Sequence, residues 1–237
     1  MPIIKTEAVI LKCDKYRETS SIVTFYSRDH GKVKGIAKGV RNSKSRWGGA
    51  LQPMAFVNIM YYYKETRNLH LISGAEYIKP YSSLYNDYDK MQLAFRMVEL
   101  INKTTAESQE NTNIYNLLIE SLFQLDDSSK NIVNVLFNFK FRLLSLLGFR
   151  LDTSGLAAGN IEKDIENPYF YETKLSAGDV KTIEALSGGN FKRVMALNIS
   201  KTQVFAFDKF FENYLRTHFE HAGYSNTKRV FSSQEMF

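Results

Sequence analysis

The sequence predicts an α+β protein in which a small five-stranded β-barrel is followed by a mainly α-helical region. Residues 1–80 contain short runs of β-branched and alternating apolar residues, separated by turn-forming residues. From residue 88 onward the apolar residues recur every three or four positions, as on one face of a helix. We therefore expect two domains, residues 1–80 and 81–237, with an irregular segment at 149–178 in the second.

Five strands are expected in the first domain. They are Glu7–Lys12, Ser21–Tyr26, Lys32–Lys38, Phe56–Tyr63 and Leu69–Tyr77. Short strands at this spacing, with turns between them, are typical of a closed barrel. The fourth strand is apolar on both faces. One face is expected to fill the barrel, and the other to meet the second domain or, alternatively, nucleic-acid bases.

The second domain is expected to be a helical bundle. Its segment Lys130–Leu147 is apolar on nearly every face and should be the buried centre. Asp126 and Asp127 are interpreted as N-cap residues of that helix, and Gly148 as its C-terminal cap. A capping-box pattern, Ser200–Gln203, predicts the start of the last long helix.

Positive charge is concentrated in the first 80 residues. They hold 14 lysines and arginines against 6 acidic residues, whereas the rest of the chain holds 17 against 19. Between Asp29 and Glu65 there is no acidic residue at all. Cations without counter-charges repel one another in the folded state, so this stretch favours a polyanionic partner.

We predict that a nucleic-acid site occupies this basic stretch. The expected phosphate contacts are Lys32, Lys34, Lys38, Arg41, Lys44 and Arg46. Trp47, the only tryptophan, follows the densest part of the run and is a candidate for stacking on a base. Two alternatives stay open: the charges belong to a solvated loop, or Trp47 is a core residue.

The sequence offers little for catalysis or metal binding. Cys13 is the only cysteine, so an internal disulfide and a thiolate zinc site are both excluded. Neither a Walker-type phosphate loop nor a nucleophile elbow occurs. His218 and His221 lie one helical turn apart, but no further metal ligand accompanies them. We expect no enzymatic activity, no cofactor and no metal.

The chain has neither a signal-peptide pattern nor a membrane-span pattern. Its N-terminus lacks the long apolar core of a signal peptide. No apolar run approaches the roughly 18 residues that a membrane span requires. We expect a cytoplasmic protein, associated with the nucleoid if its partner is DNA.

The order of several motifs resembles the bacterial RecO family. In the first domain these motifs are Thr6–Leu11, Tyr16–Tyr26, Gly31–Arg41, Leu51–Phe56 and Leu69–Glu76. In the second domain they are Phe139–Arg150, Tyr214–Phe219 and Lys228–Ser233. Each motif alone is loose, whereas their common order and spacing are fairly specific and extend over nearly the whole chain.

This resemblance implies an N-terminal OB-fold barrel, a helical C-terminal domain and no enzymatic turnover. It implies a recombination mediator of DNA repair that binds single- and double-stranded DNA and anneals complementary strands. The implied partners are RecR, the C-terminal tail of single-strand-binding protein and, indirectly, RecA. The alternatives are an RNA-binding OB module without a role in recombination and, from a different class, a nuclease.

One departure from the family concerns zinc. Many RecO proteins have four cysteines after the Leu-Leu-Gly-Phe motif, whereas Thr153–Gly159 contains none. The resemblance therefore implies a zinc-less variant in which segment 149–178 replaces the metal site. Basic residues on otherwise apolar helices are the expected contacts for the acidic tail of single-strand-binding protein. These residues are Lys140, Arg142 and Arg150.

Overall fold

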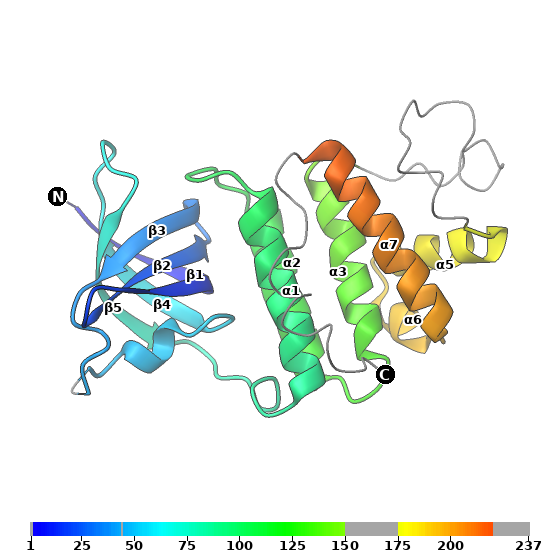
Figure 1. The fold of residues 1–237 in the computed structure, drawn as a ribbon, viewed down its shortest axis with the longest axis horizontal. Coiled ribbons are helices and arrows are strands. Elements are labelled where there is room, and N and C mark those ends of the chain that lie inside the picture. The colour runs from blue at the N-terminus through cyan, green and yellow to red at the C-terminus, as the bar shows by residue number, and fades with distance from the viewer. Residues whose placement is uncertain (1, 44, 150–174, 220–237) are drawn as a thin grey trace. The chain divides into compact units, whose positions relative to one another are not determined.

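The computed structural model describes residues 2–43, 45–149 and 175–219 (Figure 1). The chain divides into two compact units, residues 1–126 and 127–237, which we treat separately. The first unit contains the barrel that was predicted for residues 1–80 together with two helices. The second unit contains the remaining helices of the described chain.

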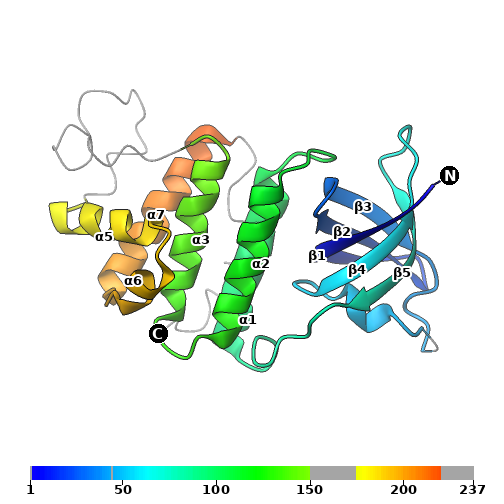
Figure 2. The same cartoon turned by 180° about the vertical axis from the view of Figure 1, so that it is seen from behind.

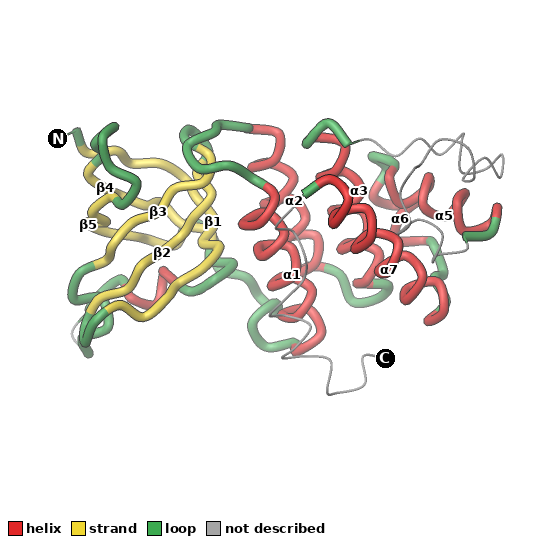
Figure 3. The backbone as a smooth tube through the Cα atoms, turned by 45° about the horizontal axis from the view of Figure 1, so that its top comes forward, coloured by secondary structure: helices red, strands yellow, loops and turns green. Residues whose placement is uncertain are grey.

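A closed five-stranded barrel forms the first part of unit 1 (Figure 3, yellow). Its strands are β1 (Ile3–Tyr16), β2 (Ser20–Ser27), β3 (Gly31–Ala37), β4 (Phe56–Tyr62) and β5 (His70–Tyr77). Their order around the barrel is β1–β2–β3–β5–β4, and β4 pairs back onto β1. All pairs are antiparallel except β3 and β5, which run parallel. The predicted OB-type barrel is thereby confirmed.

Strand β1 is longer than the predicted Glu7–Lys12 because one strand must close the barrel on two sides. Its first half pairs with β4, and its second half pairs with β2. A register shift between Ile10 and Lys12 interrupts the pairing with β2, just beyond the residues that pair with β4. Such a bulge bends a strand and increases its twist, which barrel closure requires.

The two faces of β4 have different neighbours. Val57, Ile59 and Tyr61 are completely buried in the barrel core. On the opposite face, the ring of Phe56 contacts Phe123 edge-on, with the ring centroids 6.0 Å apart. Met60, farther along that face, is 37% exposed. The outer face therefore meets a helix at one end and solvent at the other.

Two antiparallel helices complete unit 1, α1 (Tyr88–Thr104) and α2 (Thr112–Asp127), and Lys90 Nζ near the start of α1 donates to the Asp126 carbonyl oxygen at the end of α2, 2.6 Å away. The predicted N-cap role of Asp126 and Asp127 is wrong, because α2 runs through both residues and Asn131 occupies the N-cap of the next helix. The buried Asp126 carboxylate instead accepts backbone N–H bonds from the turn that leads into α1, residues 82–84. Burial alone would raise the pKa of Asp126, but these donors lower it.

Unit 2 is built around α3 (Ile132–Leu146), as its apolar pattern predicts. The other described helices are α5 (Ala177–Ser187), α6 (Phe191–Ala196) and α7 (Lys201–His218). In Figures 1 and 2, α3 and α7 lie side by side, and Phe137 contacts Phe207 edge-on between them. Gly148, with φ +88°, ends α3 in a Schellman motif, and Ser200 opens α7 with a capping box. Both predictions are confirmed.

Two asparagines interrupt the apolar surface of α3 and bind the ends of other helices. The amide of Asn138 donates to the carbonyl oxygens of Leu186 and Gly188, at 2.6 and 3.0 Å. Asn134 donates to Val194 and Leu197, at 2.9 Å in both cases. These carbonyls lie at the C-termini of α5 and α6, where no intrahelical donor is available. The buried amides therefore fix the positions of α5 and α6 on α3.

Candidate nucleic-acid interface

The loop between β3 and β4 carries most of the predicted nucleic-acid site. After β3 the chain makes two successive turns, in which Asn42 N–H donates to the Gly39 carbonyl and Ser45 N–H to the Asn42 carbonyl. Gly39 adopts a φ of +67°, which a residue without a Cβ tolerates at little cost. The short 3₁₀ helix η1 (Gly48–Leu51) follows.

This loop is held against the barrel at several points. The backbone N–H of Arg41 donates to Thr19 in the β1–β2 turn, at 2.9 Å. The hydroxyl of Tyr77 on β5 donates to the Gly49 carbonyl, at 2.7 Å. Val40, Ala50 and Leu51 are buried in the barrel core. The loop backbone is therefore organised before any ligand binds.

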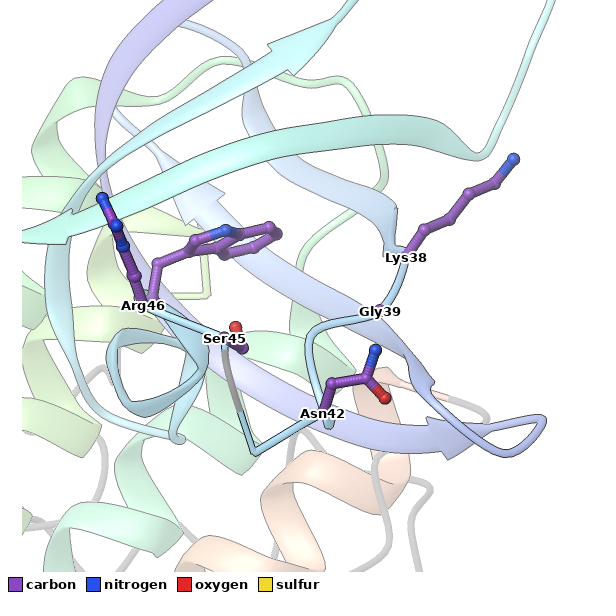
Figure 4. Close-up of a pocket in the computed structure, with 6 residues that line it drawn as sticks. Lys38, Gly39, Asn42, Ser45 and Arg46 are labelled. Carbon is purple, nitrogen blue, oxygen red and sulfur yellow. The ribbon is translucent and has the colours of Figure 1, made fainter.

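A pocket of about 340 Å³ opens in this loop (Figure 4). Its lining residues are Lys38, Gly39, Asn42, Ser45, Arg46 and Trp47. Figure 4 shows the exposed side chains of Lys38 and Arg46 on opposite sides, with Ser45 between them. Trp47 is partly buried and packs against the barrel core while it also lines the pocket. Core contact and exposure to a ligand therefore coexist at Trp47.

The two basic residues on β3 differ from those in the loop. Lys32 is only 8% exposed, and its Nζ donates to the carbonyl oxygen of Asn102, 2.7 Å away. That carbonyl lies in the last turn of α1, where a positive charge is favourable. Burial lowers the pKa of Lys32, although nearby Glu107 opposes the shift. The structure thus corrects the expectation that Lys32 is an exposed phosphate contact, because it caps a helix of the same chain.

The segment between α1 and α2 covers the start of β3. The backbone N–H of Ser108 donates to the Lys32 carbonyl, at 2.9 Å. A Cβ on Gly31 would lie 1.9 Å from the Gln109 carbonyl oxygen, so only glycine permits this approach. Lys34 forms a salt bridge with Glu107, and both side chains are partly exposed. The cations on β3 therefore already have partners within the chain.

Three of the predicted phosphate contacts are exposed in the described structure: Lys38, Arg41 and Arg46. Arg41 also donates from Nη1 to the Arg17 carbonyl, at 3.2 Å, which holds its guanidinium over the β1–β2 turn. Lys44 lies outside the described residues.

Sequence reasoning missed Asn42 and Ser45, which line the same pocket. The hydroxyl of Ser45 is buried and has no hydrogen-bond partner among the described residues. The only sequence signal for these residues was the presence of turn-forming Asn and Ser residues among the cations of 41–46, and loops commonly contain such residues.

The predicted partner contacts of unit 2 differ in how deeply they are buried. Lys140 is fully buried, with its Nζ 2.5 Å from Asp208 Oδ1 and over the rings of Phe137 and Phe211. It is thus a core ion pair rather than the accessible cation that was expected. Arg142 is half-buried. Arg150 lies outside the described residues.

The described part of the chain contains neither a cluster of metal-binding side chains nor a membrane-spanning helix. Among those residues, no group of three or more histidine, cysteine or acidic side chains is placed to hold a metal ion. No helix in residues 2–43, 45–149 and 175–219 is long and apolar enough to cross a bilayer.

The closed barrel with its exposed basic loop places the chain among OB-fold proteins, a class whose barrels bind oligonucleotides and oligosaccharides. Residues 1–81 match the family model described as Recombination protein O N terminal, and residues 85–226 match Recombination protein O C terminal. The chain therefore belongs to the RecO family.

Relatives in several bacteria are similar to the chain. A protein named DNA repair protein RecO from Thermoanaerobacter sp. (strain X514) is 27% identical over 235 residues, 93% of this chain and 94% of that protein. A protein of the same name from Caldanaerobacter subterraneus is 28% identical over 235 residues, again 93% of this chain and 94% of that protein. That from Chloroherpeton thalassium is 33% identical over 150 residues, which are 63% of this chain and 58% of that protein.

Proposed function

We propose that this chain is a recombination mediator of DNA repair. It binds single- and double-stranded DNA and anneals complementary strands without enzymatic turnover. With RecR it helps to load RecA onto strands covered by single-strand-binding protein. Membership of the RecO family, whose similar members are named DNA repair proteins, supports the role in repair. We place this activity in the cytoplasm, on nucleoid DNA.

The observation that carries the DNA-binding proposal is the exposed basic loop on the barrel. Lys38, Arg41 and Arg46 project from a backbone that the barrel holds in place. Because this loop is ordered before binding, little conformational entropy is lost when phosphates bind. Trp47 lines the pocket between two of the cations and provides an aromatic surface for a base.

Annealing follows from the same chemistry. Two complementary strands repel each other through their phosphates, and contacts to lysine and arginine release the counterions condensed on them. Phosphate contacts carry no sequence information, so most base edges stay available for pairing. A protein that holds strands by their backbones can therefore bring them together whatever their sequence.

For unit 2 we propose a role as acceptor for the acidic tail of single-strand-binding protein. Family resemblance motivates this part, and Arg142 is the described basic residue on α3 that is not fully buried. Lys140 would contribute by keeping the helices in place, because its charge is already bound inside the unit.

The experiment that tests the function combines binding and annealing with the full chain. Labelled single strands, duplexes and an RNA of the same sequence are titrated by fluorescence anisotropy at several salt concentrations. Annealing of two complementary oligonucleotides is then followed by energy transfer between dyes. We expect binding to DNA and faster annealing. Absence of annealing would contradict the mediator function. Binding to RNA alone would indicate an RNA-binding OB module instead.

A further inference from the structure

The pocket in the β3–β4 loop contains more polar chemistry than phosphate binding requires. Lys38 and Arg46 supply the positive charge, yet the amide of Asn42 and the hydroxyl of Ser45 line the same space. The Ser45 hydroxyl is buried with no partner among the described residues, and a buried hydroxyl without a hydrogen bond is unfavourable until a water or a ligand supplies one. A ligand that carries donors and acceptors beside its phosphates fits this lining.

The backbone around the pocket fixes where these polar side chains stand. Asn42 takes part in two consecutive turns, through its N–H to Gly39 and through its carbonyl to Ser45. A Cβ on Gly48 would lie 2.7 Å from the Val40 carbonyl oxygen, so glycine at this position lets the two ends of the loop approach. The side chains are therefore presented by a closed loop rather than by a free one.

We propose that this pocket receives one unstacked nucleotide of a single strand and that Asn42 gives it a preference for adenine. This inference rests on the proposed function and deepens it. The volume of 340 Å³ lies at the lower end of the roughly 300–1,000 Å³ that is typical of small-ligand pockets. One nucleotide, not a stack of several, is the unit that fits.

Each group of the pocket has a partner on such a nucleotide. An asparagine amide presents a donor and an acceptor side by side, which match N7 and the N6 amino group of adenine. In a single strand these base edges are not hidden by pairing. Trp47 offers a ring for stacking, and the cations on opposite sides of the pocket (Figure 4) receive the flanking phosphates.

The test compares three oligonucleotides of equal length: oligo-dT, oligo-dA, and a strand of abasic sites with the same backbone. Anisotropy titrations with the full chain should rank the affinities as dA, then dT, then abasic. We expect dA to exceed the abasic strand by about tenfold, at the low end of what stacking on an aromatic side chain contributes.

Variants separate the two parts of the proposal. Asn42→Ala should remove the preference of dA over dT and keep the preference of dT over the abasic site. Trp47→Phe, which keeps an apolar ring against the barrel core, should weaken both preferences while the salt dependence stays constant. Asn68→Ala, an exposed asparagine that does not line this pocket, is the matched control and should change neither. Thermal unfolding checks that each variant is folded.

The outcomes also distinguish the nucleotide pocket from the proposed DNA-binding function. If the chain binds all three strands equally well, the nucleotide pocket is overturned and DNA binding stands. If none of the strands binds, the proposed function itself fails. Retention of the dA preference in Asn42→Ala would remove Asn42 from base recognition.

Discussion

The two halves of the basic stretch behave differently although their composition is similar. On β3, Lys32 is buried against the end of α1 and Lys34 pairs with Glu107. In the loop that follows, Lys38 and Arg46 face solvent around a pocket. The lysine side chains of β3 lie beside α1 and the segment that follows it, which supply partners for both. The loop side chains have no such element beside them in the described structure and extend into solvent. The same sequence signal therefore yields structural cations in one half and available cations in the other.

Lys140 in unit 2 extends this comparison to a fully buried charge and gives the largest expected effect. Removing one partner of a buried ion pair costs about 3–5 kcal/mol. Lys140→Met should therefore lower the free energy of unfolding by that amount, as measured by urea denaturation. Lys140→Met combined with Asp208→Leu should recover most of the loss, because neither charge then remains buried.

The exposed Lys192 is the matched control for that prediction, and Lys192→Met should leave unfolding unchanged. If Lys140→Met instead unfolds like the wild type but fails to bind the tail peptide of single-strand-binding protein, Lys140 is a partner contact and its placement in the core is contradicted.

Lys32 is expected to show a smaller effect of the same kind. A hydrogen bond from a charged donor contributes about 1.5–3 kcal/mol, and Lys32→Met would leave the Asn102 carbonyl without this donor. Lys38→Met should change the unfolding free energy by less than about 0.5 kcal/mol, because surface substitutions seldom do more. Equal unfolding curves for the two variants would erase the distinction between strand and loop.

The loop cations should dominate the salt dependence of DNA binding. Each phosphate contact on a single strand contributes about −0.7 to the log–log salt slope. Replacing Lys38 and Arg46 together by alanine should flatten this slope by about 1.4 and weaken binding about tenfold at physiological salt. All sequences should be affected alike by the loss of phosphate contacts. A slope that stays constant in this double variant would move the DNA site away from the loop.

Glu107 offers a way to convert a β3 cation into an available one. Glu107→Gln removes the carboxylate that pairs with Lys34, so Lys34 becomes free to bind a phosphate. The salt slope should become steeper by about 0.7 and the affinity should rise about fourfold at physiological salt. Glu110→Gln, on the same segment, makes the same change of charge without touching this pair. If both variants raise affinity equally, net charge alone explains the effect.

The sequence was sufficient for the elements but not for the contacts between distant ones. Alternating strands, the apolar segment of α3 and the Ser200 capping box all depend on local patterns, and the structure confirms them. Lys32 was misplaced because its partner Asn102 follows 70 positions later. Asp126 was misinterpreted for a related reason, since its carboxylate binds a turn 42–44 positions earlier. Only the packing of α1 against the barrel, and of the end of α2 against the turn before α1, brings these groups together.

Lys140 and the pocket illustrate two further limits of sequence reasoning. The pattern placed α3 at the buried centre of its unit, yet Lys140 was assigned to a partner because it is a basic residue on an otherwise apolar helix of a chain that resembles the RecO family. Its counter-charge, Asp208, lies on α7. In the loop, the cations and Trp47 were visible as a cluster. The contribution of Asn42 and Ser45 depends on turns that no periodicity encodes.

The smallest expected effect concerns His70, which is buried in the barrel, unlike the exposed cations of the β3–β4 loop. His70 is 5% exposed, its ring stacks on Tyr63, and its Nδ1 has no partner among the described residues. Burial lowers the pKa of His70, and His30 adds to the shift. The native state thus favours the neutral ring, and the unfolded chain takes up the proton first. The contribution of the neutral His70 ring to the free energy of unfolding is therefore complete above about pH 6.5, the ordinary pKa of histidine. It is lost as the pH falls from there toward the native pKa of His70.

His70→Phe keeps a ring between the same neighbours and cannot be protonated. Its unfolding free energy should therefore decrease less than that of the wild type between about pH 6.5 and pH 5. His30→Phe makes the same exchange at a half-buried ring that stacks on Tyr63, and because it removes only the smaller cause of the His70 shift, its decrease should lie between those of the wild type and His70→Phe. Because burial also lowers the pKa of His218, each variant is compared with the wild type at every pH rather than with a constant value. Parallel pH profiles for the wild type and His70→Phe would show that the buried imidazole accepts a proton in the native barrel without cost.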